Sequence, residues 1–254
     1  MKRHLTILIA LAAAACGTEG GHGEAGYGTL RIDCRAEARI ETAASRAETL
    51  PEGTEFALHL TGDGFDRTWE HVADFAAEEP LLKEGRYTAT VAYGDPDTEG
   101  YNLPCFRGAT DVAVVARRTA TASVTAQLAN VPAVVRATPQ FLAYYHDIRL
   151  TLTTEAGNEF LHELDAEGYE ERDIYVRAGG TLAVAGTARR QSQTGTDAGI
   201  EVRFDAVTRT AERGKRHIFL FDAPETGGAT LTIRIGEDYA ETVEIDCELN
   251  DEAR

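Results

Sequence analysis

The sequence predicts an all-β protein made of antiparallel β-sandwich domains. Apolar and polar residues alternate with period two in many short runs, which is the pattern of strands with one buried face. Turn residues such as Gly62-Asp63-Gly64 separate the runs. The chain shows no regular alternation of helices with strands, and this excludes a parallel α/β sheet as the basis of the fold.

The first half of the chain contains the most regular of these runs. Residues 119–128 place small apolar side chains on one face and Thr, Ser and Gln side chains on the other. Residues 70–79 predict one short helix, because Val72, Phe75 and Ala76 have helical spacing. Residues 111–115 alternate less regularly than the others. The remaining strands expected in this half cover residues 30–34, 56–60 and 87–93.

Asn130-Val131-Pro132 follows the longest run and predicts a domain boundary, because proline does not continue a central strand. Alternation then restarts. We therefore expect two β-sandwich domains of immunoglobulin or transthyretin type in tandem, over residues 27–130 and 131–254. Residues 82–91 and 176–185 resemble each other in a turn followed by a strand, which indicates a duplication. The strands expected in the second half cover residues 148–152, 174–176, 182–184, 200–204, 218–221, 231–235 and 243–249.

The N-terminus has the features of a lipoprotein signal. Lys2 and Arg3 precede an uncharged stretch, residues 5–15, which is shorter than the roughly 20 residues that span a bilayer. Small residues then lead into Cys16, as in a bacterial lipobox, with Ala13 where leucine is usual. We expect residues 1–15 to be cleaved, Cys16 to be lipidated, and the glycine-rich residues 16–26 to form a tether. An ordinary signal peptide that ends near a cysteine is the alternative.

Composition excludes several classes of partner. The formal net charge is −17 and the pI is about 4.8, so the surface is expected to repel nucleic-acid phosphates and anionic lipid headgroups. Membrane attachment is expected through the N-terminal lipid rather than through a basic patch. The expected location is therefore the outer membrane, with the protein facing the periplasm or the cell surface.

Cysteine usage does not indicate a disulfide scaffold. Of the four cysteines, Cys34 and Cys247 share the phase of apolar neighbours in alternating runs. Buried free thiols are the default for such positions. A Cys34–Cys105 disulfide is an open alternative, since sequence does not report the required geometry.

No arrangement of residues predicts catalysis, a cofactor or a metal. The seven histidines form no zinc-binding pattern, and His59 between Leu58 and Leu60 is expected on a strand surface. His146 and Asp147 are candidates for an acid–base pair. Adjacent strand residues point to opposite faces, however, and this argues against their cooperation.

Two further groups allow a binding interpretation and a structural one. Asp95, Asp97 and Glu99 have the alternate spacing of a calcium loop, but the expected twelfth ligand is replaced by Phe106, which favours a polar turn. The aromatic residues Phe141, Tyr144 and Tyr145 suit stacking on a sugar ring. Such clusters more often pack in a core or an interface.

Several short segments of turn and strand-entry residues stand out along the chain. They are Gly26-Tyr27-Gly28-Thr29-Leu30, Gly85-Arg86-Tyr87-Thr88, Ala92-Tyr93-Gly94-Asp95, Leu103-Pro104-Cys105-Phe106-Arg107-Gly108 and Leu128-Ala129-Asn130-Val131. With the signal and Cys16, they resemble a family of two-domain lipoproteins of unknown function from Bacteroidetes, whose sandwich domains are similar to fimbrillin-type pilus and adhesin proteins. This resemblance implies a non-catalytic binding or structural role, in adhesion or a fimbria-like assembly, with a protein or glycan partner. A carbohydrate-binding accessory lipoprotein is the first alternative, and a hydrolase is a weaker one.

The same resemblance suggests assembly by strand addition. Residues 30–34 would be the removable strand, and Arg35, Arg39 and Arg46 after it are possible sites for an arginine-specific protease. The alternative is a plain surface loop.

The first prediction concerns the anchor. Replacing Cys16 with serine is expected to abolish lipid attachment and processing at this site, because the thiol is the group that would be acylated. Metabolic labelling with a fatty acid, followed by membrane fractionation, measures both effects. A Cys16→Ser variant that is labelled and sediments like the wild type would contradict the lipoprotein interpretation.

Overall fold

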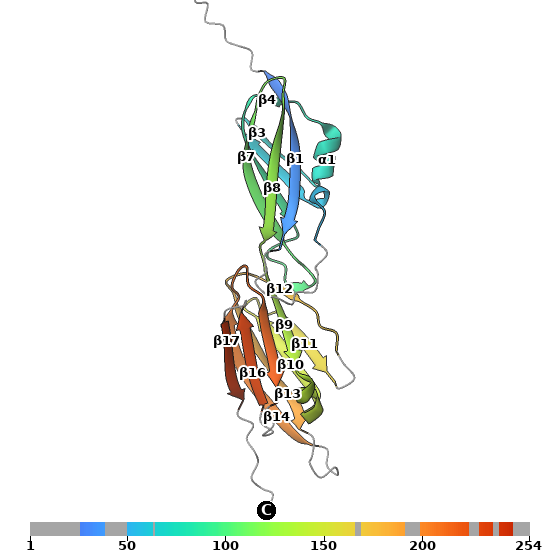
Figure 1. Ribbon diagram of the computed structural model, residues 1–254, viewed down its shortest axis with the longest axis vertical. Coiled ribbons are helices and arrows are strands. Elements are labelled where there is room, and N and C mark those ends of the chain that lie inside the picture. Colours follow the sequence, from blue (N-terminus) through green and yellow to red (C-terminus); the bar gives the residue numbers. More distant parts are fainter. Residues whose placement is uncertain are drawn as a thin grey trace, which may run out of the picture.

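A computed structural model describes residues 26–38, 50–62, 64–165, 169–190, 199–223, 229–235 and 239–245. Strands dominate this part of the chain, so the expected all-β class is confirmed. The molecule is elongated, with the N-terminal strands in the upper part of Figure 1 and the later strands in the lower part. Two clusters of buried side chains occupy these parts. We call them the N-terminal core, which includes Phe56, Leu58, Leu60, Phe75 and Val91, and the C-terminal core, which includes Leu150, Leu152, Phe204, Phe219 and Leu231.

One seven-stranded sheet surrounds the N-terminal core, in the order β3-β2-β5-β7-β8-β1-β4. Its neighbours pair antiparallel except for β1 and β8, which run parallel from the pair Thr29–Thr119 to the pair Glu37–Gln127. The strands are β1 Tyr27–Glu37, β2 Ala57–Gly62, β3 Phe65–Trp69, β4 Leu82–Lys83, β5 Gly85–Tyr93, β7 Phe106–Val114 and β8 Thr119–Leu128, with the 3-10 turn η1 Gly53–Glu55 before β2.

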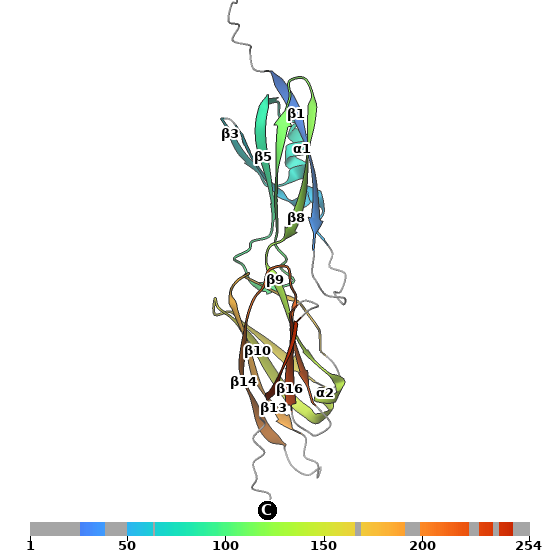
Figure 2. The same cartoon turned by 60° about the vertical axis from the view of Figure 1, so that its left-hand side comes forward.

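The short helix expected in this half is present as α1, Val72–Glu78. Its buried residues Val72 and Phe75 face the N-terminal core, and Phe75 makes an edge contact with Trp69. The helix lies beside the sheet on the side of β1 (Figure 2). Glu79 ends it in a left-handed conformation. Helical spacing of the apolar residues was therefore a reliable signal even for a helix of seven residues.

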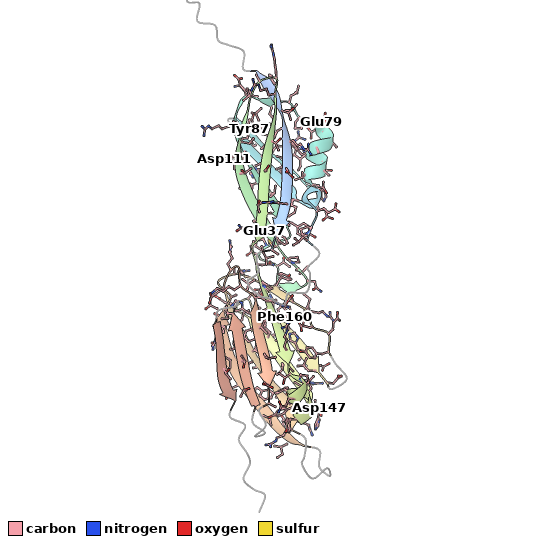
Figure 3. The ribbon with its side chains drawn as sticks, viewed as in Figure 1. Glu37, Glu79, Tyr87, Asp111, Asp147 and Phe160 are labelled. Carbon is pink, nitrogen blue, oxygen red and sulfur yellow. The ribbon has the colours of Figure 1, made fainter. Side chains whose placement is uncertain are left out.

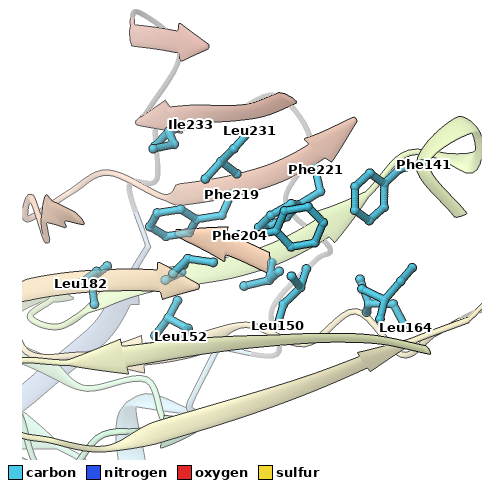
Figure 4. Close-up of a cluster of buried hydrophobic side chains, with 14 of the residues drawn as sticks. Phe141, Leu150, Leu152, Leu164, Leu182, Phe204, Phe219, Phe221, Leu231 and Ile233 are labelled. Carbon is cyan, nitrogen blue, oxygen red and sulfur yellow. The ribbon is translucent and has the colours of Figure 1, made fainter. Parts of the chain in front are cut away.

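Two sheets face each other across the C-terminal core. Figure 4 shows Leu150, Leu152, Leu164 and Leu182 from one sheet opposite phenylalanine and aliphatic side chains from the other. The four-stranded sheet has the order β11-β10-β13-β14, with β10 Tyr145–Thr154, β11 Glu159–Leu164, β13 Thr181–Arg190 and β14 Ile200–Thr210. The six-stranded sheet has the order β17-β16-β15-β9-β12-β6, with β6 Gly100–Tyr101, β9 Val131–Ala137, β12 Ile174–Val176, β15 His217–Asp222, β16 Ala229–Ile235 and β17 Tyr239–Ile245.

Three details differ from the sequence-based expectations. Pro132 lies inside β9, a central strand, where it is opposite Tyr175 of β12 and one residue before the ladder with β15 begins at Ala133. Helix α2, Pro139–Tyr144, was not expected, although Thr138 caps it and proline occupies its first turn. The last strand, β17, begins at Tyr239, earlier than expected, and is described as far as Ile245; the rest of the expected strand, with Cys247, lies outside the described residues.

Contacts cross between the two parts at several points. β6 belongs to the first half of the sequence but pairs with β12 in the six-stranded sheet. Tyr175 of β12 in turn belongs to the N-terminal core. The buried Asn130 side chain accepts a hydrogen bond from the backbone N–H of Cys105 at 3.0 Å and donates one to the carbonyl of Leu103 at 2.8 Å. The junction is thus a set of buried, paired polar groups rather than a bare linker.

The second prediction concerns the boundary after Asn130, which stays a prediction. Fragments 26–130 and 131–254 are each expected to give a β-rich circular dichroism spectrum, because each core draws almost all its buried residues from one fragment. Both should melt at a lower temperature than the intact chain, which alone retains the β6–β12 pairing. If neither fragment folds while the intact chain does, the two cores form one cooperative unit and the boundary is wrong.

Candidate functional site

A β-bulge in β10 brings His146 and Asp147 together. The pairing of β10 with β13 changes register between His146 and Arg149, and Asp147 has a φ of 49°. The Nδ1 atom of His146 lies 3.2 Å from the Asp147 carboxylate, and the Arg189 Nε lies 3.8 Å from it. The argument that these neighbours point to opposite faces is therefore wrong at this site. A bulge inserts an extra residue and changes the direction of its side chain.

Asp147 lies at the rim of a polar hollow of about 450 Å³ on the four-stranded sheet. Figure 3 places Asp147 near the lower end of the molecule, away from the N-terminal strand. Arg149 of β10 pairs across the strands with Glu163 of β11, at 3.2 Å. The hollow is lined by Asp147, Ile148, Arg149, Glu163, Leu164, Asp165, Thr187, Ala188, Arg189 and Glu201.

The side chains of this hollow are suited to forming hydrogen bonds with a ligand at a hydrated surface. It presents four carboxylates, which accept hydrogen bonds, and two guanidinium groups, which only donate them. The side chains of Asp147, Arg149 and Glu163 are 70%, 67% and 63% exposed, so they are hydrated and free to exchange water for a ligand. No group of three acidic, histidine or cysteine residues suitable for a metal occurs in the part of the chain that the structure describes.

The calcium-like residues have structural partners instead. The Asp95 carboxylate accepts hydrogen bonds from the N–H of Asp97 at 3.0 Å and the hydroxyl of Thr98 at 2.9 Å, which lower the pKa of Asp95. Asp97 lies 3.3 Å from the Arg177 guanidinium. Glu99 binds groups of the C-terminal part. The polar-turn interpretation describes this segment, with a role at the junction that its spacing did not reveal.

The aromatic residues proposed for sugar stacking belong largely to the C-terminal core. Phe141 and Tyr145 are fully buried and stack on each other with centroids 4.6 Å apart. Tyr144 is partly buried against the same cluster. The packing interpretation is therefore confirmed for this group. Tyr27 is the one aromatic residue among the exposed large hydrophobic side chains of the described residues.

The remaining candidates, a histidine and the cysteines, show no sign of a reactive site among the described residues. His59 is half-exposed and hydrogen-bonds the Asp66 carboxylate at 2.8 Å, as expected of a surface histidine. Cys34 and Cys105 are free thiols, so the alternative of a disulfide between them is not realised. Burial, with a smaller effect of Asp33, raises the pKa of Cys34 to about 11, which leaves the thiol protonated and unreactive. Cys16 lies outside the described residues, and its lipidation stays a prediction.

A second, smaller hollow of about 280 Å³ contains a buried histidine that the sequence did not single out. His162 of β11 faces Tyr101 of β6, with ring centroids 6.2 Å apart, and the Arg172 guanidinium lies 5.5 Å from the Tyr101 ring. The Nε2 atom of His162 is buried and has no hydrogen-bond partner among the described residues. Burial, and then the charge of Arg172, lower the pKa of His162 to about 4, so it is neutral at pH 7.

Comparison with known proteins gives a family and a set of distant structural neighbours. A family model described as a domain of unknown function, DUF4493, matches residues 24–251. No curated protein matches the chain in sequence. No helix in the described ranges is long and apolar enough to cross a membrane.

The solved structures that match are of low identity. One is a candidate polysaccharide binding protein (DUF1812) from Bacteroides thetaiotaomicron, at 9% identity and a TM-score of 0.47, covering 85% of this chain and 98% of that one. Candidate cell adhesion proteins from Bacteroides ovatus and Bacteroides eggerthii match at 13% and 7% identity with TM-scores of 0.43 and 0.42. Each covers 88% of this chain, and the match spans 99% and 97% of those chains. At these scores they do not bear on the function of this chain.

The third prediction is a loss of stability in acid that depends on His162. Because its pKa is about 4 in the folded chain and about 6.5 when exposed, the unfolded chain binds the proton first as the pH falls. The contribution of neutral, buried His162 to the free energy of unfolding is complete above pH 6.5. It is lost between about pH 6.5 and pH 4, and the loss is roughly 3 kcal/mol at most. His217, whose pKa burial also lowers, acts in the same direction.

Urea unfolding at a series of pH values measures this loss. A His162→Phe variant keeps the ring and the contact with Tyr101 but has no titrating group, so its stability should fall less between pH 6.5 and pH 4. His59→Gln, at an exposed position, is the matched control and should follow the wild type. Equal pH dependence in His162→Phe and the wild type would contradict the prediction.

Proposed function

This chain belongs to the DUF4493 family, and we propose that it is a lipid-anchored protein of the cell envelope that binds a partner and catalyses no reaction. The anchor is the expected lipid on Cys16. The binding surface is the polar hollow at the bulge of β10, and the proposed ligand is a neutral glycan. Adhesion to such a glycan, or its capture for use by other envelope proteins, is the corresponding biological role.

The observation that carries this proposal is the mixture of donors and acceptors in the hollow. Sugar hydroxyls both donate and accept hydrogen bonds, so they fit carboxylates and guanidinium groups placed next to one another. Arg149 beside Glu163, and Arg189 beside Asp147, provide two such pairs. The four carboxylates outnumber the two guanidinium groups, which disfavours phosphate and sulfate esters and favours uncharged sugars.

The exposure of these groups supports binding rather than catalysis. Acid–base catalysis by a carboxyl group is favoured by a site that excludes water and tunes the proton affinity of the group. The His146 and Asp147 side chains are 40% and 70% exposed, which is the condition of surface residues. We therefore assign Asp147, which lines the hollow, to ligand binding rather than to catalysis with His146.

The hypothesis of a fimbria-like assembly stays a prediction. Arg35 lies within β1, where its Nε donates a hydrogen bond to the hydroxyl of Thr125 at 3.2 Å, so this arginine is a poor protease site. Arg39 and Arg46 lie outside the described residues. Nothing in the described residues favours removal of β1 over its retention, and we do not propose assembly as the function.

The fourth prediction tests the hollow. The unlipidated mature chain, applied to an array of neutral oligosaccharides, is expected to bind at least one of them, with the affinity then measured by calorimetry. Asp147→Asn and Arg149→Gln should each weaken that binding by about tenfold or more, because each removes a charged hydrogen-bonding partner. Asparagine tolerates the left-handed conformation, so the bulge is preserved in Asp147→Asn.

The matched control is Asp66→Asn, which removes an exposed carboxylate from β3 in the N-terminal part. It should leave glycan affinity unchanged. Binding that survives both hollow variants would assign the ligand to another surface. Absence of binding to every neutral oligosaccharide would contradict the proposed ligand class.

A further inference from the structure

The end of the molecule from which the N-terminal segment emerges has an unusual surface for so acidic a protein. We define the tip as residues 26–29, 81–86 and 115–118, which meet where β1, β4 and the turn between β7 and β8 come together. It forms the top of the ribbon in Figure 1. The sequence as a whole carries a net charge of −17. Within the tip, Glu84 is the one carboxylate against four cationic side chains.

These four cations are exposed and free of ion pairs. They are Lys83, Arg86, Arg117 and Arg118, and no salt bridge joins any of them to an acid in the described ranges. Elsewhere the basic side chains are often paired, as Arg67 is with Glu78 and Arg136 with Glu171. Part of the unpaired positive charge in the described residues therefore lies at the tip, where it can attract an anionic surface.

Exposed apolar side chains lie among these charges. Tyr27 is 58% exposed, Leu81 69% and Val115 49%, and they are three of the seven exposed large hydrophobic residues in the described part of the chain. Tyr27 pairs with Lys83 in the ladder of β1 and β4, so Tyr27, Leu81 and Lys83 share its outward face. Side chains of this mixed kind, cationic and apolar with a tyrosine, are suited to a lipid–water interface.

The backbone holds the tip in one geometry. Arg117 has a φ of 60°, which is unfavourable for arginine, and its N–H donates a hydrogen bond to the carbonyl of Tyr27 at 2.8 Å. The carbonyl of Arg118 accepts one from Thr29 at 3.0 Å. Gly28 permits this close approach, since a Cβ there would lie 2.4 Å from the carbonyl oxygen of Val115. The three segments are therefore fixed to one another as a single surface.

We propose that the tip is a second membrane contact, which binds the anionic headgroups of the bilayer in which the protein is anchored. The commitment to a bilayer rests on the proposed lipid at Cys16, only ten residues before Gly26 in the sequence. As a random coil, such a tether has ends roughly 17 Å apart. This separation is about twice the Debye length of about 8–10 Å, but a random coil also takes shorter end-to-end distances, at which the tip cations come within reach of the surface potential.

The contact orients the protein. A single acyl anchor leaves the attached body free to tilt, whereas attraction at the tip and repulsion of the acidic remainder favour an upright position. The polar hollow, which lies at the far end, would then face away from the bilayer. The tip contact would thus fix the orientation of the polar hollow relative to the bilayer, which the lipid anchor alone does not.

The fifth prediction is that the tip binds anionic vesicles without the lipid. The unlipidated mature chain, residues 17–254, contains every residue the structure describes. At low ionic strength it should co-sediment with vesicles of phosphatidylglycerol and phosphatidylcholine, and not with phosphatidylcholine alone. Each cation near an anionic surface contributes roughly fivefold, so the triple variant Lys83→Gln, Arg86→Gln and Arg118→Gln should bind roughly a hundredfold more weakly.

The matched control is Arg172→Gln, Arg203→Gln and Arg213→Gln, three exposed arginines of the C-terminal part that do not line the polar hollow and that change the net charge equally. It should bind like the wild type, and Tyr27→Ser should bind more weakly. Thermal melting shows that each variant is folded. A tip variant that binds like the wild type, a control that loses binding equally, or a wild type that ignores anionic vesicles would each overturn the proposal. Because the chain carries no acyl group and no glycan, these results are independent of the proposed anchoring and ligand.

Discussion

The carboxylate of Glu99 links the two parts of the molecule, and the arrangement of its two ends depends on this contact. Glu99 follows β5, but its oxygens accept hydrogen bonds from the hydroxyl of Thr154 at 2.5 Å, the amide of Asn158 at 2.8 Å and the N–H of Arg177 at 3.0 Å. Burial alone would raise the pKa of Glu99, but these hydrogen bonds outweigh it and the pKa is lowered. An ionised carboxylate with three donors is a strong local restraint.

This restraint fixes the position of the tip relative to the polar hollow. With the β6–β12 pairing and the buried Asn130, it joins the two cores into one elongated body. The tip lies at one end and the bulge of β10 at the other. A protein held at its tip therefore presents the hollow at its full length from the membrane. The division of charge follows the same axis, with unpaired cations at the tip and excess carboxylates at the hollow.

Local signals were enough for most of the fold, and long-range contacts account for what was missed. Period-two alternation located twelve of the seventeen strands that the structure describes and missed β3, β4, β6, β9 and β11. Thr138-Pro139 was an unused signal for α2. The bulge at Asp147 was not predictable, because its left-handed backbone is fixed by pairing with β13, forty residues away. Glu99 was interpreted from its neighbours Asp95 and Asp97, whereas its partners come from the other half of the chain. The tip likewise combines three distant segments, so no basic patch was visible in the sequence.

Neutron reflectometry of the lipidated protein on a supported bilayer that contains phosphatidylglycerol tests the central claim most directly. The account predicts a protein layer about as thick as the long axis of the molecule, with the tip next to the headgroups. Replacing Lys83, Arg86 and Arg118 with glutamine should broaden this layer while the protein stays attached. A wild-type layer no thicker than the short axis, or one unchanged by these substitutions, would contradict the account.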